Sequence, residues 1–140
     1  EGAWTMLDGR REGLADYRGQ VVVLDFYATY CPPCREEIPH LVALQRRFGP
    51  QGFKVVGLNV GGVEDQAKVS DYVKSLGIQY QLANPDDELT STLLADNDVI
   101  PQTFVFDRAG KLVDHFVGFD EEVSGRLEDA VQTALATTAD

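Results

Sequence analysis

Two stretches of the chain consist almost wholly of apolar residues and favour buried strands. Val21 to Ala28 has the sequence VVVLDFYA, and Phe53 to Val60 has the sequence FKVVGLNV. A short, nearly continuous run of β-forming residues is typical of a parallel strand that is covered on both faces. Val21–Ala28 is therefore predicted to be a central strand of a sheet, and Phe53–Val60 a second strand.

Longer segments with apolar residues every three or four positions predict helices. A proline is accepted in the first turn of a helix, and a glycine often ends one. These signals place helices at about Pro32–Phe48, Glu64–Leu76, Glu88–Ala95 and Glu121–Leu135. The first helix contains Pro39, which should kink it because proline lacks the amide that an interior turn requires.

Short apolar segments beside turn signals predict the other strands. These are Ala3–Leu7, Gly13–Tyr17, Tyr80–Ala83, Thr103–Phe106 and Leu112–Val117. Strand–helix alternation favours a parallel core, and the late hairpin adds an antiparallel edge. We expect a single α/β domain over residues 1–140, with a mixed central sheet, helices on both faces and an N-terminal β-hairpin.

Length and charge narrow the classes of function. The chain has 140 residues, with 44% hydrophobic residues and a formal net charge of −11. This excess of acidic residues argues against a basic surface that binds nucleic acid and against a polybasic surface that binds a membrane. No apolar run approaches the ~20 residues that span a bilayer. A signal or membrane anchor upstream of Glu1 stays an open alternative.

The two cysteines, Cys31 and Cys34, follow directly after the first central strand, where a helix is expected to begin. A pair only three residues apart closes too small a loop to stabilise the fold greatly. A helix start favours a thiolate on the first sulfur, and the second sulfur can then displace a mixed disulfide. A redox dithiol is the favoured interpretation, while a Cys₂His₂ metal site with His40 and His115 is not excluded by count.

Asp25 is unusual because it interrupts the apolar strand VVVLDFYA. Burial of an unpaired charge is costly, so a carboxyl at this position is either exposed at an edge or kept for its chemistry. Desolvation would raise its pKa toward neutrality and make it a candidate proton carrier.

The segment Phe26–Cys34, FYATYCPPC, resembles the active-site segment of the thioredoxin superfamily, and most closely that of the TlpA/ResA-like thiol-disulfide oxidoreductases. Tyr30 stands where that family usually has tryptophan. Val99–Phe104, VIPQTF, resembles the cis-proline segment of the same family. The number of residues between Cys34 and that segment is greater than the ~30 residues that one strand–helix–strand crossover needs. Residues 77–98 therefore resemble the central strand–helix insertion of the TlpA/ResA-like branch.

The resemblance implies a role for several further residues. Pro101 would be the cis-proline that faces the disulfide, and the backbone at Ile100 would pair with an extended substrate. Gly118 resembles the glycine that lets the backbone approach the site. Together with the residues of the cysteine loop, the implied substrate-binding set is Tyr30, Pro32, Pro33, Ile100, Pro101 and Gly118.

The resemblance also implies acid–base roles for two acidic residues. Asp25 matches the buried aspartate of thioredoxins, which lies behind the second cysteine and moves its proton. Gly57 stands where thioredoxin has a lysine beside this aspartate. ResA-like proteins also carry a glutamate close to the cysteines, and Glu64 is the weaker candidate for this acid or base.

The implied function is thiol-disulfide exchange in a periplasmic or otherwise extracytoplasmic setting of a bacterium. Cys31 would attack a disulfide in a partner protein, Cys34 would resolve the intermediate, and no cofactor or metal would be needed. Pro32 and Pro33 cannot donate a hydrogen bond to the Cys31 thiolate, which favours a reductant or isomerase over a strong oxidant. The expected partners are a disulfide-containing protein and an upstream thiol donor, and the chain itself is expected to be a monomer.

The client is the least defined part of this expectation. Apocytochrome c is the usual client of the family in bacteria, and general disulfide reduction is the second candidate. A copper-binding metallochaperone of the related Sco type is an alternative from a different class, although those proteins have a wider cysteine spacing. A peroxidase fits less well, because neither cysteine has the sequence setting of the peroxiredoxins.

Overall fold

The computed structural model describes residues 2–137 and contains one seven-stranded sheet with the strand order β2-β1-β5-β4-β3-β6-β7. Strand β3 lies at the centre, parallel to β4 on one side and antiparallel to β6 on the other. The expected mixed sheet is therefore confirmed. Its strands are β1 (Trp4–Met6), β2 (Arg11–Glu12), β3 (Val21–Tyr27), β4 (Phe53–Asn59), β5 (Gln81–Pro85), β6 (Gln102–Phe106) and β7 (Leu112–Val117).

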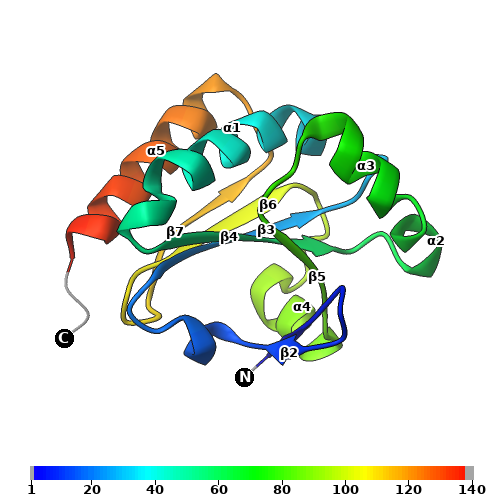
Figure 1. Ribbon diagram of the computed structural model, residues 1–140, viewed down its shortest axis with the longest axis horizontal. Coiled ribbons are helices and arrows are strands. Elements are labelled where there is room, and N and C mark those ends of the chain that lie inside the picture. The colour runs from blue at the N-terminus through cyan, green and yellow to red at the C-terminus, as the bar shows by residue number, and fades with distance from the viewer. Residues whose placement is uncertain (1, 138–140) are drawn as a thin grey trace.

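Helices cover both faces of the sheet. Figure 1 shows α1, α3 and α5 on one face, while α4 and the short 3₁₀ helix η1 lie on the other. The helices are η1 (Leu14–Tyr17), α1 (Pro32–Phe48), η2 (Gly49–Gln51), α2 (Val63–Gln66), α3 (Val69–Leu76), α4 (Asp87–Leu94) and α5 (Glu121–Ala136). Strand β5 and helix α4 form the central insertion, and β5 extends the parallel part of the sheet beside β4.

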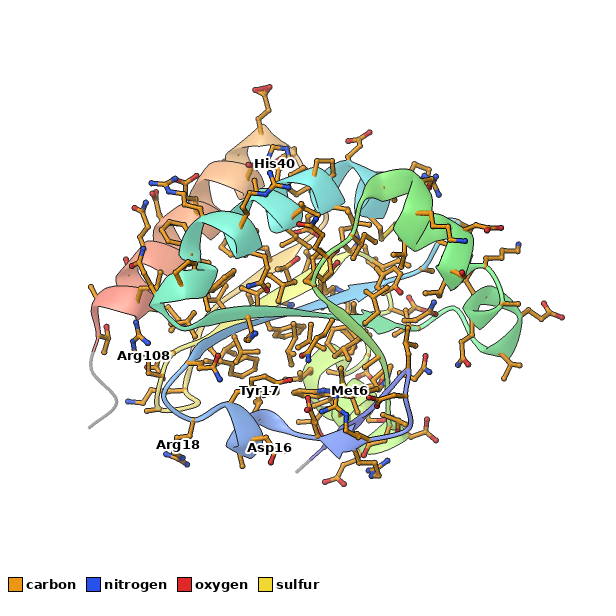
Figure 2. All side chains as sticks on the ribbon, in the orientation of Figure 1. Met6, Asp16, Tyr17, Arg18, His40 and Arg108 are labelled. Atoms are coloured by element: carbon orange, nitrogen blue, oxygen red, sulfur yellow. A yellow bond between two sulfur atoms is a disulfide. The ribbon has the colours of Figure 1, made fainter. Side chains whose placement is uncertain are left out.

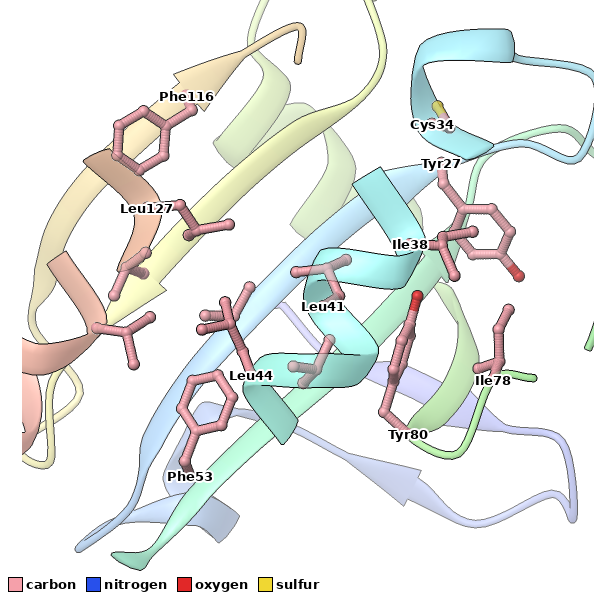
Figure 3. Close-up of a cluster of buried hydrophobic side chains, with 14 of the residues drawn as sticks. Tyr27, Cys34, Ile38, Leu41, Leu44, Phe53, Ile78, Tyr80, Phe116 and Leu127 are labelled. Atoms are coloured by element: carbon pink, nitrogen blue, oxygen red, sulfur yellow. The ribbon is translucent and has the colours of Figure 1, made fainter. Parts of the chain in front are cut away.

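Helix α1 is anchored by one continuous apolar face. Figure 3 shows Ile38, Leu41 and Leu44 of α1 above the sheet, with Phe53 of β4 below them and Leu127 of α5 to the side. All five side chains are buried. Burial of large aliphatic and aromatic side chains stabilises a fold by about 1.5–3 kcal/mol each. This packing fixes the start of α1 over the carboxyl end of β3.

Two sequence predictions about secondary structure were wrong in detail. Gly13–Tyr17 was expected as a strand, but Leu14–Tyr17 is a 3₁₀ helix. The Asp16 carboxylate accepts a hydrogen bond from the Gly13 amide at 2.8 Å. This bond stabilises a helical turn, and the Gly13 amide is not used for pairing with a neighbouring strand. The partner of β1 is the two-residue strand Arg11–Glu12.

The predicted helix over Glu64–Leu76 is divided into α2 and α3, with a break at Ala67 and Lys68. The side chain of Asp65 in α2 is turned inward and bonds to the loop after β3, which gives α2 a separate anchor. Among the described residues, the structure contains no helix with the length and apolar character needed to cross a membrane.

Candidate active site

Cys31 and Cys34 form a disulfide at the start of helix α1. Cys31 is the N-cap residue of the helix, and its sulfur accepts a hydrogen bond from the Cys34 amide at 3.2 Å. Cys31 is 6% exposed and Cys34 is fully buried. A partner can therefore reach the first sulfur more easily, and the positive end of the helix dipole favours a thiolate there.

The remainder of the cysteine loop faces solvent. Pro32 is exposed, Pro33 is half-buried, and Tyr30 is 66% exposed. Because neither proline has an N–H group, the Cys34 amide is the backbone donor that reaches the Cys31 sulfur. Tyr30, with its large exposed ring, directly precedes Cys31 in the chain.

The Ile100–Pro101 peptide bond is cis, as expected from the sequence. The Ile100 carbonyl oxygen lies 3.7 Å from the Cys31 sulfur, so this segment faces the disulfide. The Gly118 amide donates a hydrogen bond to the Pro101 carbonyl at 2.8 Å. Gly118 has φ +80° and open space where a Cβ would lie, so its backbone angle, and not a close contact, accounts for the glycine.

Asp25 is completely buried in β3, and neither carboxylate oxygen has a hydrogen-bond donor. In the sheet it pairs with Gly57 of β4 and Thr103 of β6. A Cβ on Gly57 would lie 2.6 Å from Leu82 and 3.3 Å from the rings of Tyr27 and Tyr80. Aromatic and aliphatic groups therefore fill the space in which a residue-57 side chain would lie.

Sequence analysis missed a second buried acid, Glu37 of α1. It is fully buried, and its Oε2 accepts a hydrogen bond from the Thr103 hydroxyl at 2.8 Å, while Oε1 has no donor. Its position could have revealed it, because Glu37 follows Cys34 by three residues and precedes Leu41 by four. These spacings place it on the apolar face of the helix.

The two acids form a pair that favours a bound proton. Burial raises the pKa of Asp25 well above its usual range, and the neighbouring Glu37 carboxylate raises this pKa further. Burial also raises the pKa of Glu37, from 4.5 to about 7, against the opposing effect of the Thr103 hydroxyl. Two ionised carboxylates cannot donate to each other, whereas one proton between them supplies a donor. The pair can hold and release a proton near neutral pH.

A third buried acid, Asp65, is bonded to Thr29, two residues before Cys31. It is 4% exposed and accepts hydrogen bonds from the Thr29 amide at 2.9 Å and from the Asn59 side chain at 3.1 Å. The Thr29 hydroxyl also donates to it. Burial alone would raise the pKa of Asp65, but the donors of Thr29 and Asn59 together lower it.

Glu64, the sequence candidate, is the neighbour of Asp65 and is exposed on α2. Within residues 2–137 no hydrogen bond or ion pair engages its side chain. The structure therefore brings the Ile100–Pro101 segment to Cys31 and places Asp25 beside Glu37, and it leaves Glu64 at the surface.

The two histidines are engaged elsewhere. His40 lies on the outer side of α1 (Figure 2), and its ring nitrogen is 3.2 Å from the Ser124 hydroxyl. His115 of β7 is hydrogen-bonded to Gln102. In the part of the chain that the structure describes, no three side chains of His, Cys, Asp or Glu form a group that could hold a metal ion. The Cys₂His₂ alternative therefore has no support in the geometry.

Comparison with known proteins connects this geometry to a family. The AhpC/TSA family model matches residues 4–115. The thiol-disulfide oxidoreductase ResA of Bacillus subtilis is 32% identical over 76% of this chain, and the matched part spans 58% of that relative's length. The ResA protein of Geobacillus thermodenitrificans is 30% identical over 87% of this chain and 70% of its own length.

Solved structures agree with this relationship. A thiol:disulfide interchange protein of the thioredoxin family from Chlorobium tepidum superposes with a TM-score of 0.79 and 31% identity, over 95% of this chain and 92% of its own. StoA of Bacillus subtilis has a TM-score of 0.68 at 21% identity, over 91% of this chain and 93% of its own, and so supports the fold.

Proposed function

Since the chain belongs to the AhpC/TSA family and to the ResA-like thiol-disulfide oxidoreductases within the thioredoxin fold, we propose that it reduces or isomerises disulfides in partner proteins. The observation that carries this proposal is the Cys31–Cys34 pair itself. Its first sulfur lies at a helix start beside the Ile100 carbonyl, and its second sulfur is buried on the side of α1 that also carries Glu37.

The reaction begins from the reduced dithiol. The Cys31 thiolate attacks one sulfur of the partner disulfide, which breaks that bond and releases the other partner sulfur as a thiolate that takes up a proton. Cys34 then loses its proton and attacks the Cys31 sulfur. The mixed disulfide breaks, the second partner sulfur leaves as a thiol, and two electrons have passed to the partner. An upstream thiol donor restores the dithiol.

Asp25 and Glu37 are assigned as the acceptor of the Cys34 proton. Both lie behind the redox loop, and their raised pKa values leave one of the pair protonated and the other able to accept a proton near neutral pH. General-base help of this kind contributes typically ~10²–10⁴-fold to a rate. The assignment extends the sequence interpretation of Asp25 to a pair of acids.

The direction of electron flow follows from the donors around Cys31. A strong oxidant needs a well stabilised thiolate. Here the two prolines supply no amide, the Cys34 amide supplies one bond, and buried carboxyls lie nearby. These features favour a reductant or an isomerase. By the family resemblance we also propose an extracytoplasmic place in a bacterium and apocytochrome c as a client, with general disulfide reduction as the second candidate.

A trapping experiment tests the assignment of the two cysteines. Cys34→Ser should form a mixed disulfide with a partner and stall, whereas Cys31→Ser should not react. Insulin reduction should be lost in both variants. Faster alkylation of Cys34 than of Cys31 in the reduced wild type would reverse the roles.

A parallel Cu(I) titration tests the Sco-type alternative. A protein of that type should bind Cu(I) tightly and stoichiometrically and should not reduce insulin.

A further inference from the structure

Gln102, the residue after Pro101, is fully buried and has a hydrogen-bond partner at both ends of its amide. Its side-chain nitrogen donates to the carbonyl of Asn97 at 2.8 Å and to the carbonyl of Val99 at 2.9 Å. Both carbonyls belong to the segment that leads from α4 to the cis-proline. One side chain thus holds this segment at two points.

The other end of the amide contacts strand β7. The Gln102 Oε1 is 2.8 Å from the Nε2 atom of His115. Backbone carbonyls only accept hydrogen bonds, so the amide nitrogen must face Asn97 and Val99. The oxygen then faces His115, whose Nε2 must carry a hydrogen. The imidazole ring is stacked on Phe104, with 4.0 Å between centroids and 11° between planes.

This arrangement fixes the backbone that faces the disulfide. Val99 directly precedes Ile100, whose carbonyl lies 3.7 Å from the Cys31 sulfur. On the far side of Ile100, the Pro101 carbonyl is held by the Gly118 amide at 2.8 Å. Gln102 therefore determines the position of Ile100 from one side, and Gly118 determines it from the other.

We propose that Gln102, supported by His115, is a positioning residue that makes the site selective for extended polypeptide disulfides over small disulfides. The inference rests on the proposed function, because it concerns which disulfides that dithiol accepts. A polypeptide can pair its backbone with the Ile100 segment by strand addition. A small disulfide without a peptide backbone needs only access to the Cys31 sulfur. Displacement of the Ile100 segment should therefore lower the rate of reduction of polypeptide disulfides and leave the rate for small disulfides unchanged.

The test compares second-order rate constants of the reduced protein with two substrates. One is a peptide that carries a disulfide in an extended segment, and the other is hydroxyethyl disulfide. Gln102→Leu leaves the Asn97 and Val99 carbonyls without their donor, and we expect the peptide rate to fall about tenfold. The hydroxyethyl disulfide rate should stay within about twofold, the range typical of a site that keeps its geometry. Gln132→Leu, at an exposed position of α5, is the matched control and should change neither rate.

A second variant covers the case in which Gln102→Leu does not fold. His115→Leu removes the partner of the amide oxygen at an exposed position of the edge strand β7. It should lower the ratio of peptide rate to small-disulfide rate in the same direction, but by less. A parallel loss of both rates, or an unchanged ratio in the folded variants, overturns the positioning role. If the wild type reduces neither substrate, the proposed function fails as well, so the two failures are distinguishable.

Discussion

The protein has two buried acidic regions, the Asp25–Glu37 pair and Asp65, and their surroundings are opposite. In the pair, the Asp25 carboxylate has no donor at all, and Glu37 has one, from Thr103. Asp65 receives three hydrogen bonds, two from Thr29 and one from Asn59. All three acids are buried, yet the pKa is raised in the first region and lowered in the second.

The contrast shows that burial does not by itself decide whether a carboxyl is ionised. Desolvation favours the neutral form, and each donor to the carboxylate favours the charged form. Asp65 has enough donors to remain a fixed anion that anchors Thr29 two residues before Cys31. The Asp25–Glu37 pair lacks them, and we propose that it exchanges a proton during catalysis. On this proposal, Asp65 positions the loop and the pair serves its chemistry.

The largest expected effect is on the resolution of the mixed disulfide. Asp25→Asn and Glu37→Gln each leave a single carboxyl, so the pair that shares one proton and accepts the Cys34 proton is lost. Resolution should slow by about 10²-fold, the lower end of the range for general-base catalysis. Single-turnover kinetics separate this step from the first attack by Cys31, which should change little. Resolution rates that match the wild type between pH 6 and 9 would contradict the assignment.

The second effect is a decrease of stability with rising pH. The pKa of Glu37 is raised from 4.5 to about 7, so above pH 4.5 the folded protein holds a proton that the unfolded chain has lost. The contribution of Glu37 to stability is therefore fully present below pH 4.5 and falls as the pH rises toward 7, by up to about 1.4 kcal/mol per pH unit for each proton. The raised pKa of Asp25 acts in the same direction.

Urea unfolding of the oxidised protein at several pH values measures this decrease. Glu37→Gln and Asp25→Asn should flatten the dependence and should be more stable than the wild type at pH 8. Asp65 has a lowered pKa, so its contribution is present above its unfolded value of 3.8 and is lost only at lower pH. A stability that rises from pH 5 to 8 would be the opposite of the expected result.

A smaller effect is expected from the anchor at Asp65. Asp65→Asn replaces one acceptor oxygen by a donor that faces the donors of Thr29 or Asn59, and should cost about 1–3 kcal/mol. Thr29→Val removes only the hydroxyl donor and should cost less, whereas Thr29→Ser keeps it and is the control. The free energy of unfolding, measured by urea at pH 7, distinguishes these variants. Equal stability of Asp65→Asn and the wild type would show that the anchor is dispensable.

Most of the fold could be predicted from the sequence, because the spacing of apolar residues and the glycine and proline signals at element ends agreed with the burial seen in the structure. The bounds of α1, Pro32–Phe48, and of β7, Leu112–Val117, match the predicted ones. The prediction failed at Gly13–Tyr17, where a local hydrogen bond from the Gly13 amide to the Asp16 carboxylate competed with strand pairing. A segment of five residues is too short to show a periodicity that could reveal such a bond.

The site was predictable where its motif is local and less so where its residues converge from distant elements. Cys31 and Cys34 follow from their spacing, and Asp25 from its position inside an apolar strand. Glu37 was not singled out from the sequence, although its helical phase is that of the buried face. Asp65 contacts Thr29 across 36 residues, and no sequence pattern encodes that contact.

The smallest effect concerns Glu64, the neighbour of Asp65. Glu64 is exposed, whereas Asp65 is 4% exposed and bonded to Thr29. Because water already solvates the Glu64 carboxylate, Glu64→Gln should leave reduction and resolution rates within about twofold of the wild type, as is usual for surface substitutions. Asp65→Asn, one residue away, is the matched comparison and should lower stability. A resolution rate that falls strongly in Glu64→Gln would return Glu64 to the catalytic machinery and would mean that α2 approaches the cysteines during turnover.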